Sequence, residues 1–420
     1  MKIVLCHIAS TNLGDVVIHD CTRFILDRVL SECGIQDFTI EEVNIGKQPP
    51  VPSKPRLPLW RRAFLKIAKW TFPMSAIRLK WKWSPTGQAF VQREQAKFQG
   101  ADAVIFDGGG IVKFRQERFF LYVDEIMRWA DRARIPVLFN AVGVEGYDAR
   151  DARCRLLKCA LNRRTVKMLT TRDDAETLRR FYCPRSRLDI HQVADPAFWT
   201  PEAFGVSHAP NTTDPTIGLN VIRPEIFGEY LDPVDKAALI RLYCRLAHRL
   251  LDAGHRVEFF SNGGRQDGAF IDDLLRSDAS LADDRRLSAF RPANARELVE
   301  RIAGYGRFLA VRLHAAIIGT SLGIPNVSLV WNRKQAFFGD AVGLKGNFLG
   351  KDDFREDVIL SRLMNATGWK TNEPFRNTTL EALRHALRSI ASSSIQIDNA
   401  DRRSSFVIRC VSSQQDGLGA

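Results

Sequence analysis

The sequence predicts an α/β protein with two doubly wound, Rossmann-like domains that face each other across a central cleft. Three observations predict this fold class. Short apolar segments alternate with amphipathic, helix-like segments in both halves of the chain. A stretch without hydrophobic periodicity, from Thr200 to Pro215, separates the halves. The chain has 420 residues, of which 45% are hydrophobic, and this is enough for two domains that each bury a core.

We therefore expect an N-terminal Rossmann-like domain over residues 1–205, with a basic, Trp-rich insertion at about 47–93. A C-terminal Rossmann-like domain is expected over residues 216–390. Residues 391–420 are rich in Ser and polar side chains, which predicts a flexible tail.

In the first half, apolar runs predict five strands and the segments between them predict four helices. The strands are Ile3–Ile8, Ala101–Phe106, Pro136–Val142, Lys167–Thr171 and His191–Ala194, and the helices are Val16–Cys33, Phe119–Arg134, Ala152–Asn162 and Ala175–Phe181. Strict alternation of this kind indicates a parallel sheet.

The pattern restarts in the second half. The expected strands are Thr216–Ile222, Arg256–Ser261, Phe308–Val311 and Asn326–Val330, and the expected helices are Lys236–Ala253, Asn294–Ala303 and Leu380–Ser389. Asn377-Thr378-Thr379 is expected to cap the last of these helices.

Polar residues follow the strands of the second half, where open α/β sheets bind their ligands. They are Arg223, Asn262, Arg312, His314 and Lys334. Arg312 offers a permanently charged fork for phosphate or carboxylate, and His314 offers a proton near neutral pH. An anionic small molecule is the natural ligand of such a set.

The strand ends of the first half carry weaker signals. Asn12-Leu13-Gly14-Asp15 follows the first strand, Asp107-Gly108-Gly109-Gly110 follows the second, and Arg172-Asp173 follows the fourth. The glycines permit close backbone approach to a ligand. An ordinary helix cap at Asn12 or Asp15 and a tight turn at the glycines are the structural alternatives.

The net charge of +13 is concentrated in one segment. Eleven Lys and Arg residues and no Asp or Glu lie between Val43 and Arg93, so the rest of the chain carries only +2 (13 − 11). Half of the eight tryptophans lie there too. Trp60, Phe64 and Ile67 fall on one face of a predicted helix. The cations of the other face are Arg61, Arg62, Lys66 and Lys69.

This pattern is typical of a helix in a membrane interface, and we expect residues 54–83 to contact anionic lipid peripherally. A helix that packs its apolar stripe on the protein core is the first alternative. Nucleic-acid binding is the second, but no recognised nucleic-acid fold motif accompanies the segment, so no nucleic-acid partner is expected.

Other features limit the class of protein. The eight cysteines are scattered without a CxxC pair, which predicts reduced thiols in a cytosol and no structural zinc. Residues 1–8 read as a strand and not as a signal peptide, and no apolar run is long enough to cross a membrane. We expect a cytoplasmic protein, peripheral at the inner membrane, without a metal site.

In order and spacing, short blocks between about residues 3 and 345 resemble the polysaccharide pyruvyl transferase family. The blocks are Asn12-Leu13-Gly14-Asp15, Ala101-Asp102-Ala103-Val104-Ile105 with Gly108, Gly109 and Gly110, Arg172-Asp173, Asp195-Pro196, Arg223, Asn262-Gly263, Arg312-Leu313-His314 and Lys334-Gln335-Ala336-Phe337-Phe338. Arg312-Leu313-His314 is the most specific of them. One block departs from the family, in which Arg-Asp commonly continues to a Ser; here Asp174-Ala175-Glu176-Thr177 follows.

The resemblance implies a fold similar to the glycosyltransferase-B type and transfer of a pyruvyl group from phosphoenolpyruvate to a sugar as a cyclic ketal. It also implies that Arg223, Arg312, His314 and Lys334 surround the donor. We add Arg172 and Asn262 to this donor-binding set. Backbone contacts are expected from Asn12, Gly14, Gly108, Gly109 and Gly110.

His314 is expected to act as general acid or base, or as a hydrogen-bond donor to the phosphate if nearby cations lower its pKa. Asp107 or Asp15 is expected to deprotonate the sugar hydroxyl. Phosphoenolpyruvate is a co-substrate, and no cofactor is expected. The acceptor is expected to be a lipid-linked repeat in exopolysaccharide or cell-surface glycan biosynthesis. A nucleotide-sugar glycosyltransferase of the same fold and a non-catalytic protein that binds an anionic glycan or lipid are the alternatives.

Overall fold

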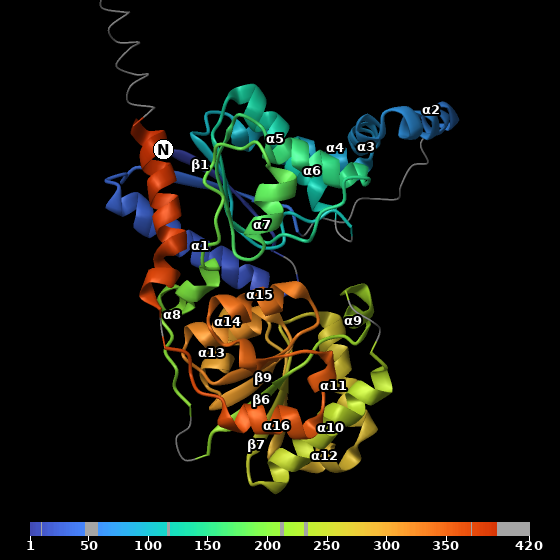
Figure 1. Cartoon of the computed structure of the whole chain (residues 1–420), viewed down its shortest axis with the longest axis vertical. Coiled ribbons are helices and arrows are strands. Elements are labelled where there is room, and N and C mark those ends of the chain that lie inside the picture. Colours follow the sequence, from blue (N-terminus) through green and yellow to red (C-terminus); the bar gives the residue numbers. More distant parts are fainter. Residues whose placement is uncertain are drawn as a thin grey trace, which may run out of the picture.

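The computed structural model describes residues 1–9, 11–46, 58–115, 118–210, 214–230, 234–370 and 372–392. These residues form two parallel sheets, one in each half of the chain, with helices against both faces. Figure 1 shows the sheets one above the other, with the first domain at the top. The expected two-domain α/β architecture is confirmed.

The first sheet has the order β2-β1-β3-β4-β5, and all its pairs are parallel. Its strands are β1 (Lys2–His7), β2 (Thr39–Asn44), β3 (Ala103–Phe106), β4 (Val137–Val142) and β5 (Val166–Thr171). Two expectations for this sheet were wrong. His191–Ala194 makes only an isolated bridge, between Gln192 and Thr171. The edge strand β2 takes a place in the sheet, although its polar sequence TIEEVN gave no apolar run.

Alternate residues of the central strands face two different cores. Ile3, Leu5 and Ile105 pack with α1 (Leu13–Glu32), whereas Val4 and Phe106 belong to the cluster on the other face. That other face is covered by α5 (Phe119–Ala133) and α6 (Ala152–Leu161), and α7 (Ala175–Thr177) follows β5. Because all these strands are parallel, their carboxyl ends lie at one edge of the sheet, and this edge faces the second domain.

The second sheet has the order β11-β10-β9-β6-β7-β8, again with parallel pairs. Its strands are β6 (Thr216–Asn220), β7 (Arg256–Phe260), β8 (Leu287–Phe290), β9 (Arg307–Ala310), β10 (Asn326–Leu329) and β11 (Phe348–Leu349). The sequence had not indicated the two edge strands, β8 and β11. The helices are α9 (Glu225–Tyr230), α10 (Lys236–Asp252), α11 (Arg265–Ser277), α12 (Ala279–Asp283), α13 (Ala295–Ala303), α14 (Leu313–Ser321), α15 (Arg333–Ala341) and α16 (Glu356–Asn365).

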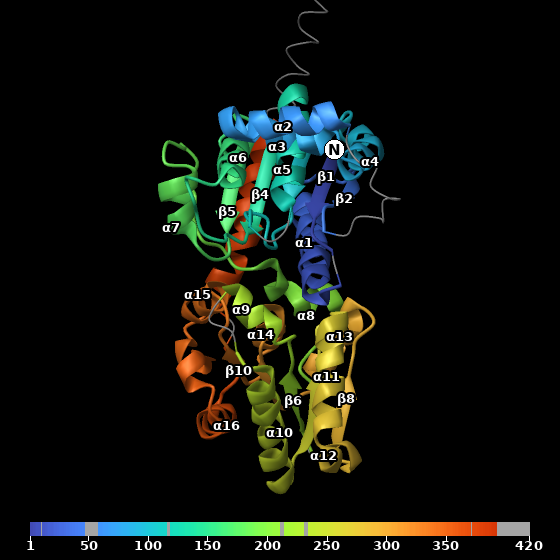
Figure 2. The same ribbon diagram turned by 90° about the vertical axis from the view of Figure 1, so that its right-hand side faces the viewer.

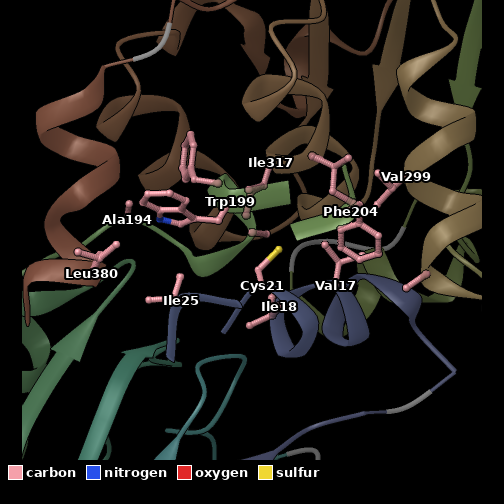
Figure 3. Packing of buried hydrophobic residues seen from close by; sticks show 14 of the residues in the cluster. Val17, Ile18, Cys21, Ile25, Ala194, Trp199, Phe204, Val299, Ile317 and Leu380 are labelled. Atoms are coloured by element: carbon pink, nitrogen blue, oxygen red, sulfur yellow. The ribbon is translucent and has the colours of Figure 1, made fainter. Parts of the chain in front are cut away.

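One hydrophobic cluster joins the two halves of the chain. Figure 3 shows Val17 and Cys21 of α1 opposite Val299 of α13 and Ile317 of α14, with Trp199 beside them. Because the side chains of both domains share this core, the two facing edges are held in a defined position.

The connection between the halves is partly helical, since α8 (Thr200–Phe204) occupies the start of the stretch expected to be a linker. The last described helix spans residues 373–392 and lies beside the first domain (Figure 1). The sequence had predicted that this helix begins at Leu380, seven residues later than it does. Thr378 and Thr379 are not caps but bind Ala194 through its backbone N–H and carbonyl.

The basic segment folds into α2 (Leu59–Thr71), α3 (Pro73–Lys82) and α4 (Pro85–Glu94). Lys47, Lys54 and Arg56 lie outside the described residues. Trp81 is buried in the first domain and donates to Glu125 Oε2 at 3.1 Å, which anchors α3 on α5. None of the helices among the described residues has the length and apolarity needed to span a membrane.

Candidate active-site cleft

A cleft of about 720 Å³ lies between the carboxyl ends of the two sheets. Of the residues proposed from the sequence, it is lined by Asn12, Asp15, Gly110, Arg172, Arg223, Arg312, His314 and Lys334. Gly14, Asp107, Gly108, Gly109 and Asn262 are not among its lining residues. The lining also includes Lys113, Arg118, Tyr122, Glu145, Glu229 and Trp331, which the sequence analysis did not single out. With six Lys and Arg side chains against three carboxylates, the cleft favours an anion.

His314 lines this cleft from the first turn of α14 and is buried. Its Nε2 is 3.1 Å from Arg172 Nη1 across the domain boundary. An arginine can only donate, so Nε2 accepts, and the proton of the neutral ring is on Nδ1. Nδ1 is directed at the first domain, 3.8 Å from Asp15 Oδ1. The imidazole is therefore held by Arg172 of the other domain and faces Asp15 of that same domain.

Burial lowers the pKa of His314 well below its usual range, and the charges of Arg172, Lys334 and Arg312 lower it further. The ring is thus neutral at pH 7 in the free protein and presents an N–H group at Nδ1. An anionic ligand near these cations would offset their effect and raise this pKa.

Gly14 makes the close approach of α1 to His314 possible. A Cβ on Gly14 would lie 2.4 Å from His314 Cβ and 2.5 Å from its Nδ1, far inside van der Waals contact. The glycine of Asn12-Leu13-Gly14-Asp15 therefore acts by its lack of a side chain, while Asp15, one residue later, faces the ring.

Arg312 occupies the N-cap position of α14, two residues after β9, and its guanidinium is held by a buried carboxylate. Arg312 Nε donates to Asp267 Oδ2 at 2.9 Å, and Nη2 donates to Oδ1 at 2.8 Å. Asp267 also accepts the backbone N–H of Arg223 at 2.9 Å. Asp267 lies in the first turn of α11 and was missed, because no apolar strand directly precedes it. It fixes the direction in which Arg312 faces the cleft.

The other three cations of the expected donor site also have carboxylate partners. Arg172 donates to Asp195, and Arg223 donates to Glu229. Lys334 Nζ donates to Glu145 Oε1 at 2.9 Å across the domain boundary. Lys113 Nζ lies 3.4 Å from the same oxygen. Although burial opposes it, Lys334 and Lys113 lower the pKa of Glu145. These cations are thus placed by protein carboxylates before any ligand binds.

The glycine-rich turn after β3 supports the cleft from behind. Gly108 and Gly109 have φ values of 105° and 68°, which strongly favour glycine. The carbonyl oxygen of Gly109 accepts the N–H of Gly143 at 2.6 Å, which joins the turn to the end of β4. Gly110 reaches the cleft, where a Cβ would lie 3.5 Å from Lys334 Nζ. Only Gly110 of the three therefore stands at the expected donor site.

Asn262 is fully buried and does not line the cleft, but it connects elements that carry lining residues. Its carbonyl oxygen accepts the N–H of Leu13 at 2.9 Å, a backbone bond between the two domains. Its Oδ1 accepts Asn220 Nδ2 at 3.0 Å, and Asn220 Oδ1 accepts the N–H of Arg312 at 2.9 Å. Asn220, also missed from the sequence, ties the ends of three strands together.

Asp107 is buried behind the cleft wall and forms a hydrogen bond of 3.0 Å with His19 Nδ1. Burial raises the pKa of Asp107. Burial alone would lower the pKa of His19, but the bond to Asp107 raises it above its usual value. The His7 ring stacks on His19 with centroids 4.0 Å apart. These three side chains are of types that bind metals. One ligand atom of each side chain lies within 4.8 Å of those of the other two.

Replacement of His7 by Gln should weaken the acid sensitivity of the fold. Burial, with the charges of His19 and Lys97, lowers the pKa of His7 from 6.5 to about 3. Between these values the unfolded chain binds a proton that the native protein does not, so stability falls as the pH falls. From pH 7 to pH 5 this one group costs about 2 kcal/mol.

The measurement is the apparent Tm at both pH values. The gap between the two Tm values should narrow in His7→Gln and stay unchanged in His385→Gln, which alters an exposed histidine. An equal gap in all three proteins would contradict a neutral, buried His7.

The comparisons with known proteins show the family and the fold of the chain. A model of the family described as polysaccharide pyruvyl transferase matches residues 12–333. A search of curated proteins found no significant match. Among solved structures, UDP-GlcNAc 2-epimerase from Methanocaldococcus jannaschii has a TM-score of 0.54 at 11% identity, over 91% of this chain and 99% of that chain. An S. aureus MnaA–UDP structure has a TM-score of 0.50 at 10% identity, over 90% of each chain. At such identities the likeness establishes the fold alone, which is the two-domain α/β fold of the glycosyltransferase-B type.

Proposed function

Because the chain belongs to the polysaccharide pyruvyl transferase family, we propose that it transfers a pyruvyl group from phosphoenolpyruvate to a sugar and forms a cyclic ketal. The observation that carries the proposal is that Arg172, Arg312 and Lys334 line one cleft together with His314 and lower its pKa. Phosphoenolpyruvate bears a phosphate and a carboxylate, and forked and point cations suit both groups.

In this proposal, Arg312 and Lys334 bind the phosphate and carboxylate of the donor. Arg312 keeps its position through Asp267, and Lys334 through Glu145. The N-termini of α14 and α15 add partial positive charge, since Arg312 precedes one helix and Lys334 lies in the first turn of the other. The same groups stabilise the phosphate as it leaves.

The reaction needs a proton at the methylene carbon of the donor, which makes the adjacent carbon electrophilic. One sugar hydroxyl attacks that carbon, the carbon–oxygen bond to phosphate breaks, and a second hydroxyl closes the ketal. Of the two hydroxyl protons, one balances the new methyl group and the other leaves with phosphate. The bound anion raises the pKa of His314, which then takes up a proton and delivers it to the methylene carbon.

Asp15 is the group that we propose to accept the proton of the sugar hydroxyl. It lines the cleft and lies 3.8 Å from His314, so the two residues can share protons through the substrate. Asp107 was the other candidate from the sequence. Its buried bond to His19 gives it no route to the acceptor, so we do not propose it further.

The acceptor is proposed to be a sugar of a polysaccharide repeat carried on a lipid, with the enzyme acting at the cytoplasmic face of the membrane. Synthesis of exopolysaccharide or another surface glycan is the corresponding process. The alternative, a nucleotide-sugar glycosyltransferase of the same fold, predicts a different donor in the same cleft.

Calorimetric titration distinguishes the two donors. Phosphoenolpyruvate should bind the wild-type protein. Binding should weaken on the order of 10²-fold in Lys334→Met, because the anionic donor loses the charge of Lys334 as its partner in the cleft. Lys345→Met is the matched control, since that side chain is 87% exposed. Tight binding of UDP-sugars without binding of phosphoenolpyruvate would overturn the proposal in favour of the glycosyltransferase.

A further inference from the structure

Helix α2 carries most of the large apolar side chains that the described part of the chain exposes. Six of the eight such side chains lie in residues 59–72, and Trp60, Ile67 and Trp70 have exposed fractions of 63%, 68% and 86%. Figures 1 and 2 place α2 at the outer end of the first domain, away from the second domain. An apolar face of this size at the margin of a domain is typical of an interaction site.

The opposite side of α2 borders a cationic groove of about 1470 Å³, which lies between α2–α3 and the α5–α6 side of the first domain. The groove is lined by nine Lys and Arg side chains: Arg62, Lys66, Lys69, Lys80, Arg115, Arg118, Arg150, Arg153 and Arg155. Asp151 is the single carboxylate of the lining, and it is bound to Arg153 Nε at 3.0 Å. Arg115 also lies 3.7 Å from Asp148, which is not part of the lining. The nine cations still outnumber these two carboxylates, so the groove favours an external anion.

The two faces of α2 together restrict the partner. The apolar face needs a partner that covers Trp and Ile side chains, and the groove needs one that supplies several negative charges. An anionic bilayer does both, because Trp side chains favour the headgroup level and Lys and Arg attract lipid phosphates. The alternative from the sequence, a stripe packed on the protein core, requires Trp60, Phe64 and Ile67 to be buried, and all three are exposed.

We propose that α2 docks the protein on a membrane surface that contains anionic lipid. Its apolar face inserts among the headgroups, and the groove behind it binds lipid phosphates. This docking does not depend on the reaction in the cleft. Arg118 lines both the groove and the cleft. If the proposed function also holds, the phosphate of a lipid-linked acceptor would lie in the groove with its glycan directed past Arg118.

Co-sedimentation of the full chain with vesicles tests the docking. Wild-type protein should sediment with phosphatidylglycerol–phosphatidylcholine vesicles and remain in the supernatant with phosphatidylcholine alone. Two triple variants should lose binding on the order of 10²-fold: Trp60→Ser/Ile67→Ser/Trp70→Ser for the apolar face, and Arg62→Glu/Lys66→Glu/Lys69→Glu for the groove.

Matched controls separate docking from general effects of charge and polarity. Phe181→Ser/Met364→Ser changes exposed apolar side chains elsewhere, and Arg180→Glu/Arg276→Glu/Lys345→Glu makes the same charge change at exposed positions away from α2. Both should bind vesicles like the wild type. Because α2 is exposed, the Tm of all variants should stay close to that of the wild type.

Three results would overturn the docking proposal. The first is wild-type protein that stays in the supernatant with anionic vesicles. The second is binding by both α2 variants at wild-type strength. The third is a dimer that the Trp60, Ile67 and Trp70 substitutions convert to a monomer, which would show that a second copy covers the face. The pyruvyl transfer proposal survives each of them, since it is tested with phosphoenolpyruvate and soluble glycans.

Discussion

Substitution of His314 by Ala should lower kcat/KM on the order of 10²–10⁴-fold while the protein remains folded. His314 is the one imidazole among the residues that line the cleft, and its ring is oriented by Arg172 at Nε2 and faces Asp15 at Nδ1. Ala removes both the proton carrier and the group that Arg172 holds. Steady-state phosphate release from phosphoenolpyruvate measures the loss.

The pH profile gives a second readout of the same residue. Because kcat/KM reports the free enzyme, in which the lowered pKa keeps His314 neutral, and the proposed transition state needs this histidine protonated, kcat/KM should fall about tenfold per pH unit between pH 7 and pH 8. His385→Ala changes an exposed histidine and should keep wild-type activity. A His314→Ala enzyme that keeps most of its turnover would contradict the catalytic assignment.

Gly14→Ala should reduce activity on the order of 10²-fold, although it adds only one methyl group. The new Cβ would lie 2.4 Å from His314 Cβ, and neither atom is the end of a flexible side chain. Either α1 or α14 must move, and this displaces the ring from Arg172 and Asp15. Overpacking of this kind also costs about 1–3 kcal/mol of stability.

Gly346→Ala is the matched control for Gly14→Ala. A Cβ at Gly346 meets no atom within 4 Å, so activity and Tm should stay at wild-type values. The readouts for Gly14→Ala are kcat/KM for phosphoenolpyruvate and the apparent Tm. Wild-type kinetics in Gly14→Ala would mean that the position of His314 relative to α1 is not important for the reaction.

The sequence was sufficient to predict the parts of the fold that repeat. Buried parallel strands are continuous apolar runs, and the polar residue after each run marks its carboxyl end. This logic found Arg312, His314, Lys334, Arg172 and Arg223, all of which line one cleft. It failed at the edge strands, because half of the six residues of β2 are exposed and β11 has only two residues.

The carboxylate partners of the cations could not be predicted from the sequence in the same way. Asp267 lies in the first turn of α11, far along the chain from Arg312, and Glu145 lies in a loop of the opposite domain from Lys334. Only the packing of the two domains brings these pairs together. Asp107 shows a different limit of the sequence. It follows the end of β3, as expected, but its side chain bonds to His19 and does not line the cleft.

The distribution of charge is the feature that the structure clarifies most. The cations of the cleft are few and each of the four expected ones is held by a carboxylate, which suits a small, defined donor. The cations near α2 are many, and the groove that they line holds one carboxylate. The two sets therefore suit two different ligands, a small donor and an extended anionic surface.

Analysis of the reaction products shows directly whether the protein transfers a pyruvyl group. The protein is incubated with phosphoenolpyruvate and a series of oligosaccharides, and phosphate release is followed together with the mass of each sugar. We expect phosphate to appear only when donor and acceptor are both present, and one acceptor to gain the mass of pyruvic acid less one water for each phosphate released. Consumption of a nucleotide sugar, with phosphoenolpyruvate left intact beside every acceptor, would contradict it.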